Sequence, residues 1–232
     1  MRVRMMIRAM LVVAATAMSL VALTACGGGS AQEQSNKPRP LPEKETALRP
    51  GEYRTGEYEP SLSFRVGKNW SLGGEAFQAS LHLKRRDVSE SGWLLFANVG
   101  QVYKPSTQGQ WVDVPKDMVG WYQHHPYLQT TKPEPISVGG VKGVQFDVVV
   151  KDLPKDYYGE CGSDCVDIIR AGRAGSGGHA WVWEKEKQRT IVLEDFRGTT
   201  VTIIYAFLAP EFDEMAPEAQ RVIDSMKWRE TA

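Results

Sequence analysis

The chain has 232 residues, with 28 basic and 28 acidic side chains. We expect the first 25 residues to be removed together with Arg2, Arg4 and Arg8, which leaves 25 basic against 28 acidic residues and a net charge near −3. A weakly acidic domain lacks the basic surface of nucleic-acid-binding proteins and is not attracted to anionic lipid. We therefore expect no nucleic-acid partner. Residues 51–232 are long enough for one domain with a sizeable core.

The first 25 residues have the pattern of an export signal. Three arginines precede an apolar run over residues 10–25, which is short and contains hydroxyl residues, whereas a spanning helix needs about 20 apolar residues. The run ends in Leu23-Thr24-Ala25-Cys26. These four residues resemble the lipobox of bacterial lipoproteins. The resemblance implies a diacylglyceryl group on the Cys26 sulfur and cleavage between Ala25 and Cys26.

The expected anchor fixes where the protein should lie. Two acyl chains hold a protein stably on a membrane, whereas one chain does so only marginally. We therefore expect lipid anchoring at the extracytoplasmic face of the cell membrane. Residues 26–50 have almost no large apolar side chain, so they are expected to form a disordered tether between the lipidated cysteine and the domain at 51–232.

From Pro60 onward, apolar and polar residues mainly alternate, as in strands with one buried face. The expected strands are 62–66, 77–83, 93–103, 145–151, 166–171, 180–184, 190–194 and 199–208. Gly139-Gly140 and Arg197-Gly198 are expected to form hairpin turns. Short strands separated by glycine, proline and charged residues predict a largely antiparallel sheet.

Two segments have helical patterns. The first begins with Pro115 at an expected first helical position and ends before Pro126. The second is expected to begin near Pro217, and its apolar residues recur at positions i, i+3, i+4 and i+7. These apolar residues are Ala219, Val222, Ile223 and Met226. We therefore expect an amphipathic helix at the C-terminus.

Several core and turn residues resemble a known family. Phe64-x-Val66 followed by Trp70, and the ending 222–228 (VIDSMKW), are similar to the PsbP-like family. The stretch 135–140 (PISVGG) is similar to secreted lipoproteins of high-GC Gram-positive bacteria. The resemblance covers residues 61–229 and implies an α+β domain, an antiparallel sheet covered by helices. It implies a binding or accessory role and supplies no catalytic residue.

Two further cysteines, Cys161 and Cys165, lie in the segment ECGSDCV. Outside the membrane thiols tend to oxidise, so we expect a local disulfide before the strand at 166–171. The alternative is a redox or metal pair. Redox pairs usually have two intervening residues, and here there are three, while zinc would need two more ligands.

The sequence lacks the signatures G-x-S-x-G, S-x-x-K and H-E-x-x-H. The glycine-rich segment 172–178 follows a strand and precedes another, so it predicts a hairpin loop and not a phosphate cradle. His124 and His125 are neighbours at a helix end and point about 100° apart, so a favourable helix C-terminus is expected and a shared metal is not. We expect no enzyme, no cofactor and no metal site.

The charged run 184–187 (EKEK) is expected to be a solvated hairpin tip. The strand before it, HAWVW, carries our candidate ligand site. His179, Trp181 and Trp183 share one face of this strand, and Ala180 and Val182 share the other. If the small residues pack on the core, the two indoles and the imidazole suit a flat apolar ligand face. The alternative is that both tryptophans lie in the core beneath a helix.

Trp121 and Tyr122, on the first expected helix, are the expected partners of this face. We therefore predict a non-enzymatic, membrane-anchored envelope protein that binds a lipid, a glycolipid or a cell-wall fragment. The alternative is an accessory subunit that docks on an envelope membrane complex and has no small ligand. A binder needs a concave aromatic pocket, and an accessory subunit needs an exposed apolar patch of several hundred Å². An envelope hydrolase, with two acids or a histidine–acid pair converging in a cleft, is a third alternative.

Overall fold

A computed structural model describes residues 37–74, 77–88, 90–105, 110–172 and 177–229. Of the described residues 51% are strand and 10% helix. The export signal, Cys26 and the centre of the glycine-rich loop lie outside the described residues, so these predictions stay open. Within the described ranges, no helix is long and apolar enough to cross a membrane.

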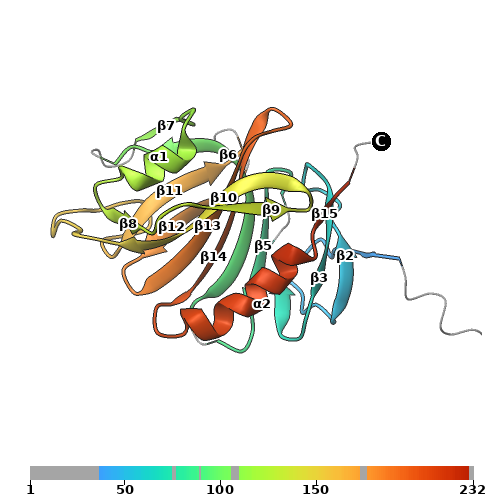
Figure 1. Cartoon of the computed structure of the whole chain (residues 1–232). Helices are drawn as coiled ribbons and strands as arrows, with labels where there is room; N and C mark the ends of the chain where they lie inside the picture. The colour runs from blue at the N-terminus through green and yellow to red at the C-terminus, as the bar shows by residue number, and fades with distance from the viewer. Residues whose placement is uncertain (1–36, 75–76, 89, 106–109, 173–176, 230–232) are drawn as a thin grey trace, which may run out of the picture. The chain divides into compact units, whose positions relative to one another are not determined.

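The large sheet has eleven strands, all paired antiparallel (Figure 1). Its main path follows the order β12-β11-β6-β14-β13-β10-β8, and the remaining four strands pair beside it. On the path lie β12 (His179–Trp183), β11 (Cys165–Ala171), β6 (Gly92–Tyr103), β14 (Thr199–Leu208), β13 (Glu186–Phe196), β10 (Val141–Val150) and β8 (Leu128–Thr130). Beside it lie β4 (Trp70–Leu72), β5 (Ser80–Arg85), β7 (Trp111–Asp113) and β9 (Glu134–Val138).

A second sheet has the order β1-β2-β3-β15. Its strands are β1 (Arg39–Pro40), β2 (Gly51–Arg54), β3 (Leu62–Val66) and β15 (Lys227–Trp228). The described part of the chain has two helices, α1 (Met118–Gln123) and α2 (Phe212–Asp224). In the second sheet, β2 from the start of the described chain and β15 from its end both pair with β3.

The described part of the expected tether packs on the domain. β1 pairs in parallel with β2, and Leu41 and Leu48 are buried. The Leu48 amide donates a hydrogen bond to the Trp70 carbonyl at 2.8 Å, which ties this segment to β4. The folded domain therefore begins near Arg39, before the boundary expected at Gly51.

The large sheet buries both of its faces. One face packs against the second sheet and α2 in a core that contains Phe64, Phe96 and Phe207. On the other face, residues from β6, β10, β11, β12 and β13 pack against one another in a second core, which α1 joins through Met118 and Tyr122. The prediction of an α+β fold with a helix-covered sheet is therefore wrong. Strands cover most of the large sheet. The four-stranded sheet and α2 pack on one face, and on the other face strands of the large sheet pack mainly against one another.

Both hairpin turns are confirmed. Gly139 and Gly140 have φ of 55° and 86°, and they join β9 to β10. Arg197 and Gly198 have φ of 55° and 78°, and they join β13 to β14. Positive φ at both central residues gives the turn a twist that matches that of the flanking strands.

The helices differ in extent from those expected. α1 begins after Asp117, whose side chain accepts a hydrogen bond from the Gly120 amide at 2.6 Å. This N-cap satisfies an amide that has no partner within the helix, so α1 starts there and not at Pro115. α2 begins at Phe212, and Pro217 lies inside it. Ala219, Val222 and Ile223 are buried, as the apolar stripe predicted.

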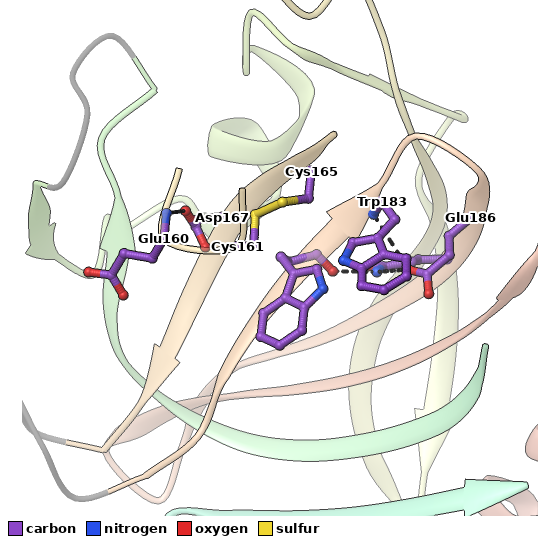
Figure 2. The surroundings of a disulfide bond; sticks show 8 residues. Glu160, Cys161, Cys165, Asp167, Trp183 and Glu186 are labelled. Carbon is purple, nitrogen blue, oxygen red and sulfur yellow. Dashed lines mark hydrogen bonds between the residues drawn. A yellow bond between two sulfur atoms is a disulfide. The ribbon is translucent and has the colours of Figure 1, made fainter. Parts of the chain in front are cut away.

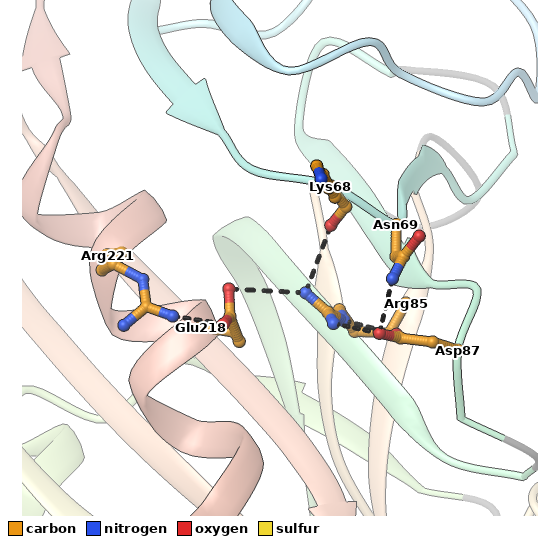
Figure 3. A network of polar contacts seen from close by, with 6 residues as sticks. All are labelled: Lys68, Asn69, Arg85, Asp87, Glu218 and Arg221. Carbon is orange, nitrogen blue, oxygen red and sulfur yellow. Dashed lines mark hydrogen bonds and ion pairs between the residues drawn. The ribbon is translucent and has the colours of Figure 1, made fainter.

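A polar network attaches α2 to the neighbouring strands (Figure 3). The Arg85 side chain is 6% exposed and pairs with Asp87 at 2.5 Å and with Glu218 of α2 at 3.6 Å. Its guanidinium also lies 5.3 Å from the centre of the buried Trp70 ring. Charge pairing and packing on an indole together fix the middle of α2 to β4 and β5.

Candidate functional site

A groove of about 330 Å³ lies between the edge strand β12 and residues of β5 and β6. We call it the tryptophan groove, because three indoles line it together with two imidazoles and several charged side chains. Its lining residues are His82, Lys84, Glu90, Trp93, Leu95, Gly178, His179, Ala180, Trp181, Trp183 and Glu186. A concave site with aromatic walls and a few polar groups is the usual form of a small-molecule site.

The structure brings His179, Trp181 and Trp183 into this groove. Ala180 and Val182 point the other way and are buried in the second core, at 3% and 0% exposure. The two tryptophans are half-buried and His179 is exposed. The rings of His179 and Trp181 lie 4.7 Å apart. The small residues of β12 thus anchor the strand, and its large rings line the hollow.

Sequence reasoning missed the opposite wall. Trp93 and Leu95 come from β6, and His82 comes from β5, paired with Leu95 in the ladder. The His82 and Trp93 rings meet edge to face at 5.9 Å. Burial, reinforced by the positive charge of Lys84, lowers the pKa of His82 to about 4. His82 is therefore neutral at neutral pH and adds a polar but uncharged group to the wall.

Glu186 is buried, at 3% exposure, although we expected the run 184–187 to be a solvated tip. Its side chain accepts hydrogen bonds from Ser91 Oγ at 2.5 Å, Gln188 Nε2 at 3.3 Å and the Trp183 amide at 3.5 Å. Gln188 also donates to the Trp181 carbonyl at 2.6 Å. Of the described strands, only β11 pairs with β12, so the other edge of β12 has no strand partner. The Glu186 and Gln188 side chains provide hydrogen-bond partners for the backbone of β12 on that edge.

Cys161 and Cys165 form the expected disulfide. Cys165 is the ladder partner of Trp183, so the bond closes a loop directly behind the groove strand. Figure 2 shows Trp183 with the disulfide on one side and Glu186 on the other. The disulfide therefore lies next to the tryptophan face, on the neighbouring strand.

The disulfide loop is also held by a buried carboxyl group. Asp167 is fully buried, and its Oδ2 accepts a hydrogen bond from the Glu160 amide at 2.6 Å. Burial raises the pKa of Asp167 above its ordinary value, although this hydrogen bond acts in the opposite direction. A Cβ atom on Gly159 would lie 2.3 Å from Asp167 Oδ2, so only glycine allows this approach.

The outer surface of the same loop is held by aromatic and charged contacts. Trp111 Nε1 donates to Glu160 Oε1 at 2.8 Å, and Arg170 pairs with Glu160 at 3.1 Å. The hydrogen bond from Trp111, with the charge of Arg170, holds the pKa of Glu160 below its ordinary value. The Arg170 guanidinium lies over the Trp111 ring at 4.3 Å. The loop thus has attachments that do not depend on the disulfide.

Trp121 and Tyr122 do not line the groove. Tyr122 is buried in the second core, with its ring 5.2 Å from Phe146. Trp121 contacts His125, whose ring centre is 5.1 Å away. His125 is itself buried, and burial lowers its pKa to about 4, so it is neutral where we expected a charge favoured by the helix end. These residues stabilise the attachment of α1.

A second hollow, of about 460 Å³, is lined by Lys116, Glu194, Asp195 and neighbouring residues, none of them aromatic. The Met118 amide of α1 donates to Glu194 Oε1 at 3.1 Å, which gives Glu194 a structural role. In the described ranges no group of three histidine, cysteine, aspartate or glutamate side chains is placed to hold a metal ion. The tryptophan groove is therefore our candidate functional site.

Comparisons with known proteins give few matches. No protein-family model matches the chain, and no curated protein matches it. Among solved structures, the chain is similar to the solution structure of cyanobacterial PsbP (CyanoP) from Synechocystis sp. PCC 6803. The similarity covers 78% of this chain and 95% of that one, with 10% sequence identity and a TM-score of 0.38.

Proposed function

We propose that this chain is a lipid-anchored protein of the cell envelope that binds a small ligand in the tryptophan groove and catalyses no reaction. The observation that carries the proposal is the convergence of Trp93, Trp181 and Trp183 on one hollow. Indoles on opposite walls can cover both faces of a flat ring, and each aromatic contact contributes roughly 0.5–1.5 kcal/mol beyond its buried area.

The size and lining of the groove narrow the ligand. A hollow of about 330 Å³ is near the lower limit for small-molecule sites, so it suits one ring-sized group better than a whole lipid. Polar groups from His82 and Glu186 also face it, which favours a ring with hydroxyl or amino substituents over an acyl chain. A glycolipid head group or a cell-wall fragment has this character.

The expected anchor at Cys26 would place such a site close to its ligand. If the twelve residues between Cys26 and β1 form the expected tether, they reach roughly 19 Å on average. A domain held at that distance meets membrane-bound and wall-bound ligands without diffusing away. The location rests on the lipobox resemblance, and the groove does not depend on it.

Native mass spectrometry of the full chain, purified in mild detergent from the envelope of its own host, tests the proposal. We expect a bound mass of several hundred daltons that is lost on unfolding. The double variant Trp181→Ala/Trp183→Ala should lose this mass. Trp111→Ala is the matched control, because Trp111 is also half-buried but does not line the groove.

Two results would oppose the proposal. A wild-type protein that carries no ligand would favour the accessory-subunit alternative, and crosslinking in the envelope would then identify the partner. A ligand retained by the double variant and lost from Trp111→Ala would place the binding site elsewhere.

A further inference from the structure

Glu186 presents a buried carboxyl group to the tryptophan groove. Its three donors, Ser91 Oγ, Gln188 Nε2 and the Trp183 amide, are all neutral groups. Within the described part of the chain, no lysine, arginine or histidine forms an ion pair with it at 4.0 Å or less. A buried acid is costly to keep unless a positive partner or several donors compensate it.

A cation of the protein already lies on the aromatic wall. Lys185 Nζ is 5.0 Å from the centre of the Trp183 ring and forms an ion pair with Glu90. Glu90 lines the groove, and both of these charged side chains are about half exposed to solvent. The Trp183 ring and the Glu90 carboxylate therefore already accept an ammonium group, and this group belongs to a solvent-exposed lysine.

Resting on the proposed function, we propose that the ligand is a ring that carries a protonated alkyl amine. The ring stacks on Trp181 and Trp183, and the ammonium group takes the place of Lys185 beside Glu90, where Glu186 also faces the groove. Ammonium groups bind to tryptophan faces through the ring quadrupole and to carboxylates through charge-assisted hydrogen bonds. The ligand class is a ring-bearing amine, either an arylalkylamine or an amino sugar.

The other groups that face the groove are compatible with this charge. Burial keeps His82 neutral above about pH 4, so it does not repel an ammonium group at neutral pH. Lys84 is exposed, and solvent screens its charge. His179 is the remaining titratable group of the wall, and it is also exposed. Of the two carboxylates that line the groove, Glu186 is buried. Electrostatic attraction to an ammonium group is strongest at such a buried charge.

The test compares matched pairs of probes that differ in the amine. 2-Phenylethylamine is compared with 2-phenylethanol, and glucosamine with glucose, by calorimetric titration of the full chain in detergent at pH 7. We expect the amine of one pair to bind about tenfold more tightly than its neutral counterpart, as a charge-assisted bond allows. The pair that shows the difference distinguishes an arylalkylamine from an amino sugar.

Three variants locate the effect. Glu186→Gln should abolish the preference for the amine. Lys185→Met should tighten amine binding several-fold, because it removes the internal competitor, and leave neutral probes unchanged. This variant is at an exposed position and should fold even if Glu186→Gln does not. Lys142→Met, also at an exposed lysine but outside the groove, is the control. It should change neither the binding of the amines nor the binding of the neutral probes.

The outcomes separate this inference from the proposed function. Equal binding of amine and neutral probes, lost in Trp181→Ala/Trp183→Ala, would overturn the inference and keep the groove as a binding site. Weaker amine binding in Lys185→Met would also overturn it. Failure of all four probes to bind would overturn the inference, while a native ligand mass that depends on the tryptophans would still support the proposed function.

Discussion

Reduction of the Cys161–Cys165 disulfide should lower stability modestly and leave the groove intact. The bond links residues separated by four positions, so it closes a very small loop. In the chain-entropy model, a loop of about five residues contributes about 2 kcal/mol by restricting the unfolded chain. For a domain of this size, 1 kcal/mol corresponds to about 2–4 °C in Tm. Reduction should therefore lower Tm by about 4–8 °C.

The folded loop should persist because other contacts hold it. The Glu160 amide donates to Asp167 at 2.6 Å, and Gly159 and Gly162 exchange backbone hydrogen bonds at 2.8 and 3.2 Å. Arg170 also pairs with Glu160 from outside the loop. The groove strand β12 is thus supported by β11 whether or not the sulfur atoms are joined.

The assay is thermal unfolding followed by near-UV circular dichroism, with and without a phosphine reductant, together with native mass spectrometry of the bound ligand. Cys161→Ala/Cys165→Ala is the control, and its Tm should not respond to the reductant. A loss of ligand on reduction would refute the reasoning, since it would show that the disulfide shapes the folded groove. A fall in Tm above 15 °C would refute it as well.

Three further predictions concern parts outside the groove. Arg85→Met should destabilise the domain by about 1–2 kcal/mol in urea unfolding, less than a fully buried pair because Glu218 reaches water; no change would contradict the role of this network. Burial lowers the pKa of His125 from 6.5 to about 4, so the unfolded chain binds the extra proton and stability falls as pH drops through that interval. His82 contributes to the same slope, so His125→Asn should reduce it without abolishing it, and an unchanged slope would contradict the assignment. Cys26→Ala should release the protein from the membrane fraction, and persistence there would oppose the lipid anchor.

The strands and hairpins could be predicted because their signals are local. The predicted bounds 62–66 and 199–208 coincide with β3 and β14 residue for residue, and the paired positive-φ turns lie where glycine permits them. The cover of the sheet could not be predicted in the same way. β1, β2 and β15 are short, and they become a sheet only when chain segments far apart in sequence meet on β3.

The candidate site, too, could be predicted only in part from the sequence. Five residues of alternating size were enough to place Trp181 and Trp183 on one face of β12. Trp93 was out of reach, because its distance from β12 depends on how the sheet encloses its second core. The burial of Glu186 could have been predicted, because it alternates along β13 with Gln188, Thr190 and the core residue Val192, which are buried on the same face. The charged residues on either side of Glu186 obscured this alternation.

The central claim is that the tryptophan groove holds the ligand. A crystal structure of the full chain, isolated from its own envelope without a ligand-stripping step, tests it most directly. We predict non-protein density stacked on Trp181 and Trp183, with Lys185 displaced from Trp183. An empty groove with Lys185 still against Trp183, and ligand density at another surface, would contradict the claim.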